Sequence, residues 1–133
     1  METLEGTART VGLFDIGTNS VRLSIVQVRG GVPVVVNQQR EMVRLGEGEF
    51  RDGELQPESM DRCAAVCRRF RDLVRSYGDG EIVAVATSAT RDAANQGRFL
   101  ARLREEADLY VRVISGREEA RLIYLVVVSG LHL

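Results

Sequence analysis

Several residue types are scarce in this chain, and each shortage excludes a class of chemistry. All 18 basic residues are arginine, so the chain can form neither a Schiff base nor a phosphate loop that depends on lysine. A single histidine, His132, and two cysteines leave too few ligands at metal-binding spacing for a zinc site. We therefore expect Cys63 and Cys67, four residues apart on a predicted helix, to be small buried thiols.

Long apolar segments and a strong net charge are also missing. The longest apolar run, LIYLVVV at residues 122–128, is far shorter than the roughly 20 residues that span a bilayer. The first ten residues contain no apolar core of a secretory signal, and with reduced thiols this predicts a cytoplasmic protein without a membrane partner. A net charge of −1 gives no overall attraction to nucleic acid, so an anionic ligand would need a local cluster of positive groups.

The remaining pattern is that of one α/β domain in 133 residues. Apolar alternation predicts strands, spacings of three and four predict amphipathic helices, and Gly30-Gly31 predicts a two-residue hairpin. The order βββαβαβα predicts a meander followed by crossovers to parallel strands, which is a mixed sheet of the ribonuclease-H-like type and half of an actin-like ATPase domain. The expected strands are 11–16, a segment around 21–25, 32–45, 81–86 and 109–114; the expected helices run from Pro57 to about Tyr77, from an Asn95 cap to Ala107, and onward from Ser115.

The segment LFDIGTNS places polar groups between two apolar runs. Asp15 ends the first strand, Gly17 permits backbone conformations closed to other residues, and Thr18, Asn19 and Ser20 supply hydroxyl, amide and N–H donors. Such a nest of donors suits a phosphate, and a carboxylate at its rim suits Mg²⁺ held largely through water. A hairpin connection that uses these residues for turn geometry alone explains the composition equally well.

Two further segments follow later strands. In VATSATRDA, Arg91 comes after the strand 81–86, at the edge where α/β sheets bind ligands, and could contact phosphate through two hydrogen bonds. A capped loop with a solvated arginine is the alternative. In ISGREEARL, Glu118 stands three residues after Ser115 and completes a capping box. Glu119 points about 100° away around the helix and is either a general base or a plain acid that complements the helix dipole.

Taken in order, FDIGTNSVRLSIV, ATSATRDA and VISGREEARLIYL resemble three signatures of the exopolyphosphatase/guanosine pentaphosphate phosphohydrolase (Ppx/GppA) family. The resemblance covers residues 11–125. It implies an acetate and sugar kinase–Hsp70–actin type fold, Mg²⁺-dependent release of terminal phosphate from polyphosphate or guanosine pentaphosphate, and a homodimer of the full-length protein. By motif position it implies Asp15 as the metal-side carboxylate, Glu119 as the catalytic base, and phosphate binding by Gly17, Asn19, Ser20 and Arg91, to which the donor argument adds Thr18.

The chain departs from the family toward its C-terminus. The family continues into a second ribonuclease-H-like half that opens with a phosphate loop of the D-[IL]-G-G-G-S type, which does not occur here, and Val126 stands where glycine is common. We expect a flexible N-terminus at 1–10 and a first ribonuclease-H-like subdomain at 11–133 that is truncated before the second phosphate loop. Its apolar run at 122–128 would favour self-association of the isolated chain.

Two other functions fit the residues as well. One is a phosphotransferase of the same superfold that acts on acetate or a sugar, since the first motif alone suits it. The other is a non-catalytic module that binds polyphosphate or a nucleotide.

Overall fold

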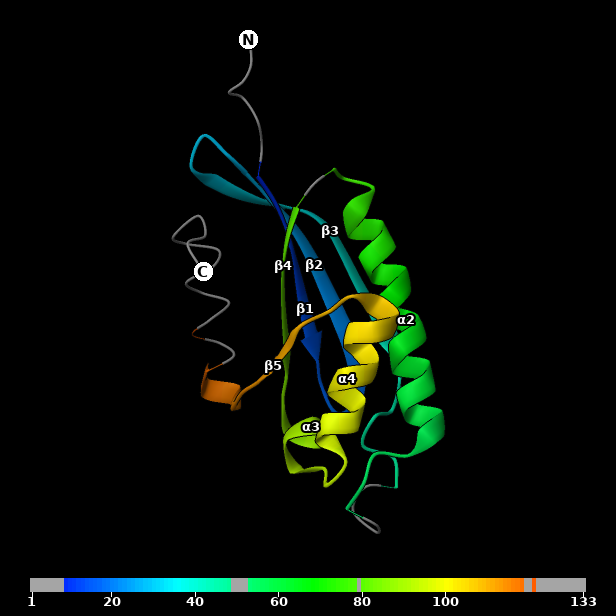
Figure 1. Ribbon diagram of the computed structural model, residues 1–133. Coiled ribbons are helices and arrows are strands. Elements are labelled where there is room, and N and C mark those ends of the chain that lie inside the picture. The colour runs from blue at the N-terminus through cyan, green and yellow to red at the C-terminus, as the bar shows by residue number, and fades with distance from the viewer. Residues whose placement is uncertain (1–8, 49–52, 79, 119–120, 122–133) are drawn as a thin grey trace.

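A five-stranded sheet forms the centre of the molecule, and the two longest helices lie against one of its faces (Figure 1). The computed structural model describes residues 9–48, 53–78, 80–118 and 121. The strands are β1 (Arg9–Ile16), β2 (Ser20–Arg29), β3 (Val32–Met42), β4 (Gly80–Ala86) and β5 (Val111–Val113), and the helices are α2 (Pro57–Arg75), α3 (Ser88–Asp92) and α4 (Gln96–Ala107).

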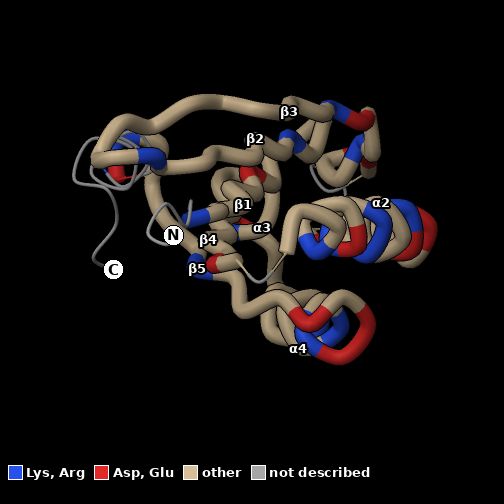
Figure 2. The backbone as a smooth tube through the Cα atoms, turned by 90° about the horizontal axis from the view of Figure 1, so that it is seen from above, with Lys and Arg blue, Asp and Glu red and all other residues tan. Residues whose placement is uncertain are grey.

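The strand order is β3-β2-β1-β4-β5, and Figure 2 shows the five strands in a row with α2 and α4 on the same side. β1, β2 and β3 pair antiparallel, whereas β4 pairs parallel with β1 and β5 pairs parallel with β4. The carboxyl ends of β1, β4 and β5 therefore meet at one edge, where Ile16 pairs with Ala86 and Ala86 with Val113. The predicted meander, with later strands added in parallel, is confirmed.

The β2–β3 hairpin contains the predicted two-residue turn and one irregularity. Gly30 and Gly31 have φ angles of 58° and 79°, a conformation that glycine adopts without strain. Further along, the register shifts between Ile25, which pairs with Asn37, and Val26, which pairs with Val35. Val36 is thus an extra residue in β3, a β-bulge.

Helix α2 begins at Pro57, as predicted, and packs its apolar stripe onto the sheet. Its buried apolar residues lie in one cluster with Phe14 of β1 and Phe99 of α4. Cys63 and Cys67 are fully buried on this stripe, as predicted. The hydrogen bond with Cys63, together with burial, raises the pKa of the Cys67 thiol, so we expect little thiolate and little reactivity there.

The close packing of α2 on β1 depends on the absence of a side chain at Gly12. A Cβ atom there would lie 2.6 Å from Cγ2 and 3.1 Å from Cγ1 of Val74. Gly12→Ala is therefore expected to lower the free energy of unfolding by about 1–3 kcal/mol through overpacking. In a Val74→Ala background the same change should cost much less, which urea denaturation of the four variants would measure as a coupling energy. Equal costs in both backgrounds would contradict this explanation.

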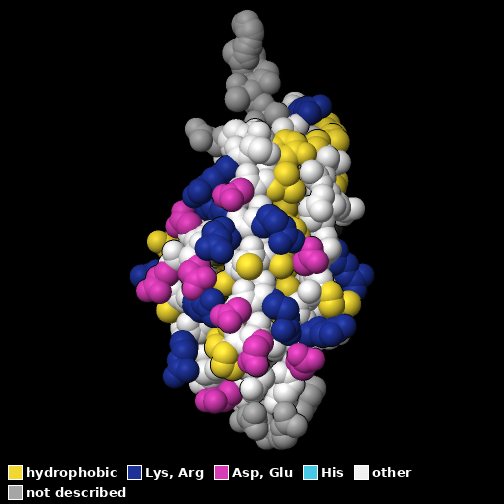
Figure 3. Space-filling model, turned by 90° about the vertical axis from the view of Figure 1, so that its right-hand side faces the viewer, with side chains coloured by type: hydrophobic (Ala, Val, Ile, Leu, Met, Phe, Trp, Pro, Cys, Tyr) yellow, Lys and Arg dark blue, Asp and Glu magenta, His cyan; other side chains and the backbone are white. Residues whose placement is uncertain are grey.

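Ion pairs connect the outer surfaces of α2 and α4, where Figure 3 shows basic and acidic side chains interspersed. Arg102 contacts Asp61 at 2.5 Å and Glu106 at 2.6 Å. Hydrogen bonds from Arg102 lower the pKa of Glu106. This pair therefore stabilises the fold above the ordinary pKa of a glutamate, and the contribution is lost as the pH falls through the lowered value. Because these side chains are partly exposed, the contribution is small.

Several element boundaries differ from the prediction, and one short helix was not predicted. β3 ends at Met42 rather than at residue 45, because the N–H groups of Val43 and Arg44 turn to bind the carbonyl of Asn19. β5 includes only residues 111–113 of the predicted 109–114, because only these pair with β4. The five-residue helix α3 was not predicted, since so short a segment has no measurable period.

The predicted role of Asn95 is partly wrong. It stands at the start of α4, but its side chain makes no capping hydrogen bond. Instead its amide accepts from the N–H of Leu55 and donates to the carbonyl of Leu55, both at 2.9 Å. The side chain thus ties the segment before α2 to the start of α4.

Among the described residues, no helix is long and apolar enough to cross a membrane. The apolar run 122–128 lies outside the described residues.

Candidate functional site

The polar loop after β1 is a tight turn that leads directly into β2. The N–H of Gly17 donates to the carbonyl of Ser20 at 3.0 Å, which closes the turn. Asp15 immediately precedes it at the end of β1 and is half-buried. The two interpretations of LFDIGTNS, as a tight turn and as a ligand site, are therefore compatible, because the turn itself brings the polar groups together.

The second predicted segment lies beside this loop. The N–H of Thr87 donates to the carbonyl of Ile16 at 3.2 Å, which extends the β1–β4 pairing past the end of β4. One residue on, the hydroxyl oxygens of Ser88 and Thr18 lie 3.0 Å apart. The structure therefore brings the first two segments together at the carboxyl edge of the sheet, as the sequence predicted.

These two segments border a cavity of about 280 Å³. Four residues of the loop contribute to its wall, and so do a carboxylate, a residue with a hydroxyl from the second segment and two arginines. The lining residues are Asp15, Gly17, Thr18, Asn19, Ser20, Arg22, Arg40 and Thr87. A concave site of this size with convergent donors and positive charge can bind an anion the size of one or two phosphate groups.

Arg22 and Arg40 are site residues that sequence reasoning missed. They pair with each other across β2 and β3, and Arg22 also pairs with Asp15 across β1 and β2, so the three side chains form one row on the same face of the sheet. Nε of Arg40 lies 3.3 Å from the hydroxyl of Ser20. An anionic ligand needs a local cluster of positive charge, because the chain as a whole is nearly neutral. Arg22 and Arg40 form such a cluster.

Arg91 lies at the same edge of the sheet but does not line the cavity. Its Nη1 donates to the carbonyl of Ile114 at 3.4 Å, and its Nε lies 3.5 Å from a carboxylate oxygen of Asp92. The N–H of Ile114 in turn donates to the carbonyl of Ala86 at 3.0 Å. Arg91 therefore joins the second segment to the third, and its role in phosphate binding stays a prediction.

The capping box predicted for the third segment is confirmed. The N–H of Glu118 donates to Oγ of Ser115, and the N–H of Ser115 donates to Oε1 of Glu118, both at 3.2 Å. These bonds fix Glu118 at the start of a helical turn that follows β5. Glu119 lies outside the described residues, so its assignment as base stays a prediction.

The oxygen donors beside Asp15 are of the kind that Mg²⁺ binds. This ion prefers oxygen ligands and retains several waters, and the cavity offers one carboxylate together with the hydroxyls of Thr18, Ser20 and Thr87. The described part of the chain contains no group of three carboxylate, thiol or imidazole side chains able to enclose a metal. The residues fit an ion held by one carboxylate and by water, with further oxygens from a bound phosphate.

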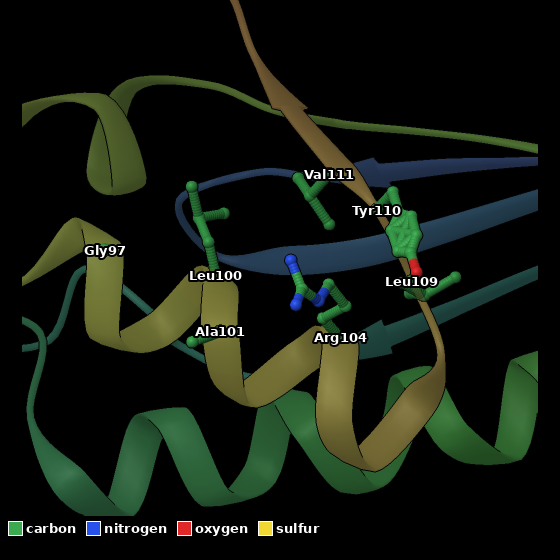
Figure 4. A pocket seen from close by; sticks show the side chains of 7 residues that line it. All are labelled: Gly97, Leu100, Ala101, Arg104, Leu109, Tyr110 and Val111. Atoms are coloured by element: carbon green, nitrogen blue, oxygen red, sulfur yellow. The ribbon is translucent and has the colours of Figure 1, made fainter.

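A larger hollow, about 480 Å³, lies between α4 and β5 (Figure 4). Leu100, Leu109 and Val111 give it a mainly apolar wall, and the guanidinium of Arg104 lies 5.5 Å from the ring centre of Tyr110. None of the predicted site residues lines it. Its chemistry offers no nucleophile or convergent set of donors, so the smaller polar cavity is the better candidate.

Curated proteins similar to this chain include exopolyphosphatases from two Mycobacterium species. Exopolyphosphatase 1 of Mycobacterium tuberculosis (strain ATCC 25618 / H37Rv) is 33% identical over 118 residues, which are 88% of this chain and 34% of that protein. The protein of the same name from Mycobacterium leprae is 32% identical over 88% of this chain and 35% of its own length. The chain thus spans about a third of the length of the curated relatives that it matches.

Solved structures agree with these relatives. The Ppx/GppA family member of Aquifex aeolicus superposes with a TM-score of 0.85 at 32% identity, over 91% of this chain and 40% of that one. An exopolyphosphatase from Cytophaga hutchinsonii gives a TM-score of 0.80 at 30% identity, over 86% of this chain and 36% of its own. These likenesses confirm the predicted fold, the first ribonuclease-H-like half of an actin-like ATPase domain. The family profile itself matches residues 24–133, and the chain belongs to the Ppx/GppA phosphatase family.

Proposed function

We propose that the full-length protein to which this chain belongs is an exopolyphosphatase, which releases terminal phosphate from inorganic polyphosphate by attack of water. The observation that carries the proposal is the cavity at the carboxyl edge of the sheet, where loop donors, one carboxylate and two arginines converge. Relatives named exopolyphosphatase support the choice of substrate.

Phosphoryl transfer depends mainly on positioning of the phosphate and on stabilisation of its charge, and the residues of the site would supply both. N–H and hydroxyl groups of residues 17–20 would hold the terminal phosphate, and Arg22 and Arg40 would bind the next phosphate along the chain. Arg91 would reach the transferred group only after leaving its contact with Ile114. Glu119 would accept a proton from the attacking water.

Mg²⁺, bound through Asp15, would supply positive charge beside the phosphoryl oxygens. The proposal also includes hydrolysis of guanosine pentaphosphate by the same site. It further includes a homodimeric full-length protein and a cytoplasmic location. The kinase alternative gains no support from the described residues.

The decisive experiment measures phosphate release from long-chain polyphosphate by the full-length protein, with Mg²⁺ and with EDTA. We expect Mg²⁺-dependent release, and gel analysis should show chains that shorten from their ends. Guanosine pentaphosphate in a parallel assay would establish the preferred substrate. Absence of phosphate release from both substrates would refute the proposal, and phosphate transfer from ATP to acetate or a sugar would replace it.

The arginine row gives a separate prediction. A charge-assisted hydrogen bond to phosphate is worth about 1.5–3 kcal/mol, and exposure of Arg22 and Arg40 to solvent lowers this value. We expect Arg22→Gln and Arg40→Gln each to raise the KM for polyphosphate by about tenfold. Arg29→Gln is the matched control, because Arg29 lies at the far end of the same strand. An unchanged KM in both site variants would remove the arginines from the site.

A further inference from the structure

The loop that follows β3 holds the phosphate-binding loop through backbone groups alone. The N–H groups of Val43 and Arg44 both donate to the carbonyl of Asn19 at 2.8 Å, and the N–H of Gly46 donates to the carbonyl of Thr18 at 2.9 Å. Residues 43–46 therefore hold two successive peptide groups of the phosphate-binding loop from one side.

This contact sets the direction of the loop's donors. In a trans peptide the C=O of one residue and the N–H of the next point in opposite directions. The carbonyls of Thr18 and Asn19 face residues 43–46, so the N–H groups of Asn19 and Ser20 point away from them. Within the described part of the chain, the N–H of Asn19 donates to no protein group. It is thus a free donor whose orientation another segment determines.

Gly46 makes the close approach possible because it has no side chain. A Cβ atom there would lie 2.6 Å from Cγ2 of Thr18 and 3.8 Å from Cβ of Ala89. Thr18 cannot rotate away freely, because its hydroxyl contacts that of Ser88 at 3.0 Å. Gly46 is not among the glycines with positive φ, so limited space, rather than backbone freedom, requires glycine at this position.

The backbone of this segment is also held in an unfavourable conformation. Arg44 has a φ of 51°, in the left-handed region that is unfavourable for a residue with a side chain. Its N–H bond to Asn19 helps to hold that conformation. Strain of this kind persists where the surrounding contacts fix the geometry.

We infer that residues 43–46 position the phosphate-binding loop, and that Gly46 is a positioning residue for the reaction. The inference rests on the proposed function, because the reaction concerned is the one proposed there. A methyl group at residue 46 displaces Thr18 and turns the donors of residues 17–20 away from the terminal phosphate. A displacement of about 1 Å in such a site can reduce the rate a hundredfold.

A double-mutant cycle in the full-length protein tests this inference. Thr18→Ser removes the Cγ2 atom that an alanine at residue 46 would meet, and it keeps the hydroxyl that contacts Ser88. We expect Gly46→Ala to lower kcat/KM for polyphosphate about 10- to 100-fold when residue 18 is threonine, and less than about threefold when residue 18 is serine. The loss should lie mainly in kcat, since Arg22 and Arg40 still bind the neighbouring phosphate. Gly97→Ala is the control, because a Cβ there meets no atom within 4 Å.

A second measurement keeps the inference separate from the proposed function. Hydrogen–deuterium exchange of the peptide that contains residues 17–20 should become faster in Gly46→Ala and return toward the unmodified rate in Gly46→Ala/Thr18→Ser. If the full-length protein releases no phosphate at all, the proposed function fails and this exchange experiment decides the inference alone. Equal penalties of Gly46→Ala in the two backgrounds, or unchanged exchange at residues 17–20, would overturn the inference.

Discussion

Glu119→Gln in the full-length protein is expected to lower kcat for phosphate release from polyphosphate by about 10²–10⁴-fold. A glutamine keeps the size of the side chain but cannot accept a proton from water at neutral pH. KM should change little, because the groups proposed to bind phosphate lie on other segments, at residues 17–20 and at Arg22 and Arg40. The measurement is steady-state phosphate release at saturating polyphosphate and Mg²⁺.

The chain offers a matched control at the adjacent residue. Glu118 already accepts the N–H of Ser115 in the capping box, and a glutamine can accept the same bond. Glu118→Gln should therefore retain nearly full kcat. If Glu118→Gln lost as much activity as Glu119→Gln, the assignment of the base to Glu119 alone would be contradicted. If Glu119→Gln kept its activity, the base would have to be sought elsewhere.

Phe14→Ala is expected to give the largest loss of stability, about 3–5 kcal/mol in the free energy of unfolding. Phe14 is 1% exposed, and its ring lies against that of Phe70 in α2, with centroids 6.5 Å apart and planes at 54°. Its removal leaves a cavity between β1 and α2, directly before Asp15. Urea denaturation of the chain, monitored by circular dichroism, would measure the loss.

An exposed aromatic residue provides the comparison for this substitution. Tyr110 is 69% exposed, and its contact with Arg104 is at the surface, so Tyr110→Ala should cost less than about 1 kcal/mol. Similar losses for both variants would mean that burial against α2 does not account for the role of Phe14.

The sequence was sufficient to predict most of the fold because hydrophobic periodicity determines it. The apolar stripe of α2, Pro57 at its start, the glycine hairpin and the strand order were all expected, and each follows from local patterns. The short helix α3 and the side-chain contact of Asn95 with Leu55 were not expected. Both depend on which segments meet in space, and no local spacing encodes that.

In the candidate site, too, local sequence motifs were predicted, whereas features that depend on contacts between distant segments were not. The polar loop and the capping box are local motifs. The capping box is confirmed, and the polar loop lines a cavity, while its binding of phosphate stays a prediction. Arg22 and Arg40 were missed because arginines on strands usually point to solvent, and only the strand register brings this pair beside Asp15. The contact of residues 43–46 with the loop involves backbone atoms, which leave no signature in side-chain chemistry.

The bulge at Val36 links the charge of the site to the length of β3. With a two-residue turn at Gly30-Gly31 and regular pairing, Arg22 would lie opposite Gln39; the extra residue moves its partner to Arg40. It also exchanges the two faces of the strand for every residue after it. Deleting one valine from the run of three at 34–36 would leave the composition almost unchanged. By removing the extra residue it would give regular pairing that keeps Arg40 opposite Arg22, whereas regular pairing of the unmodified strand would bring Gln39 to the cavity and turn Arg40 toward the helices. The register of this strand therefore matters to the site as much as the identity of its residues.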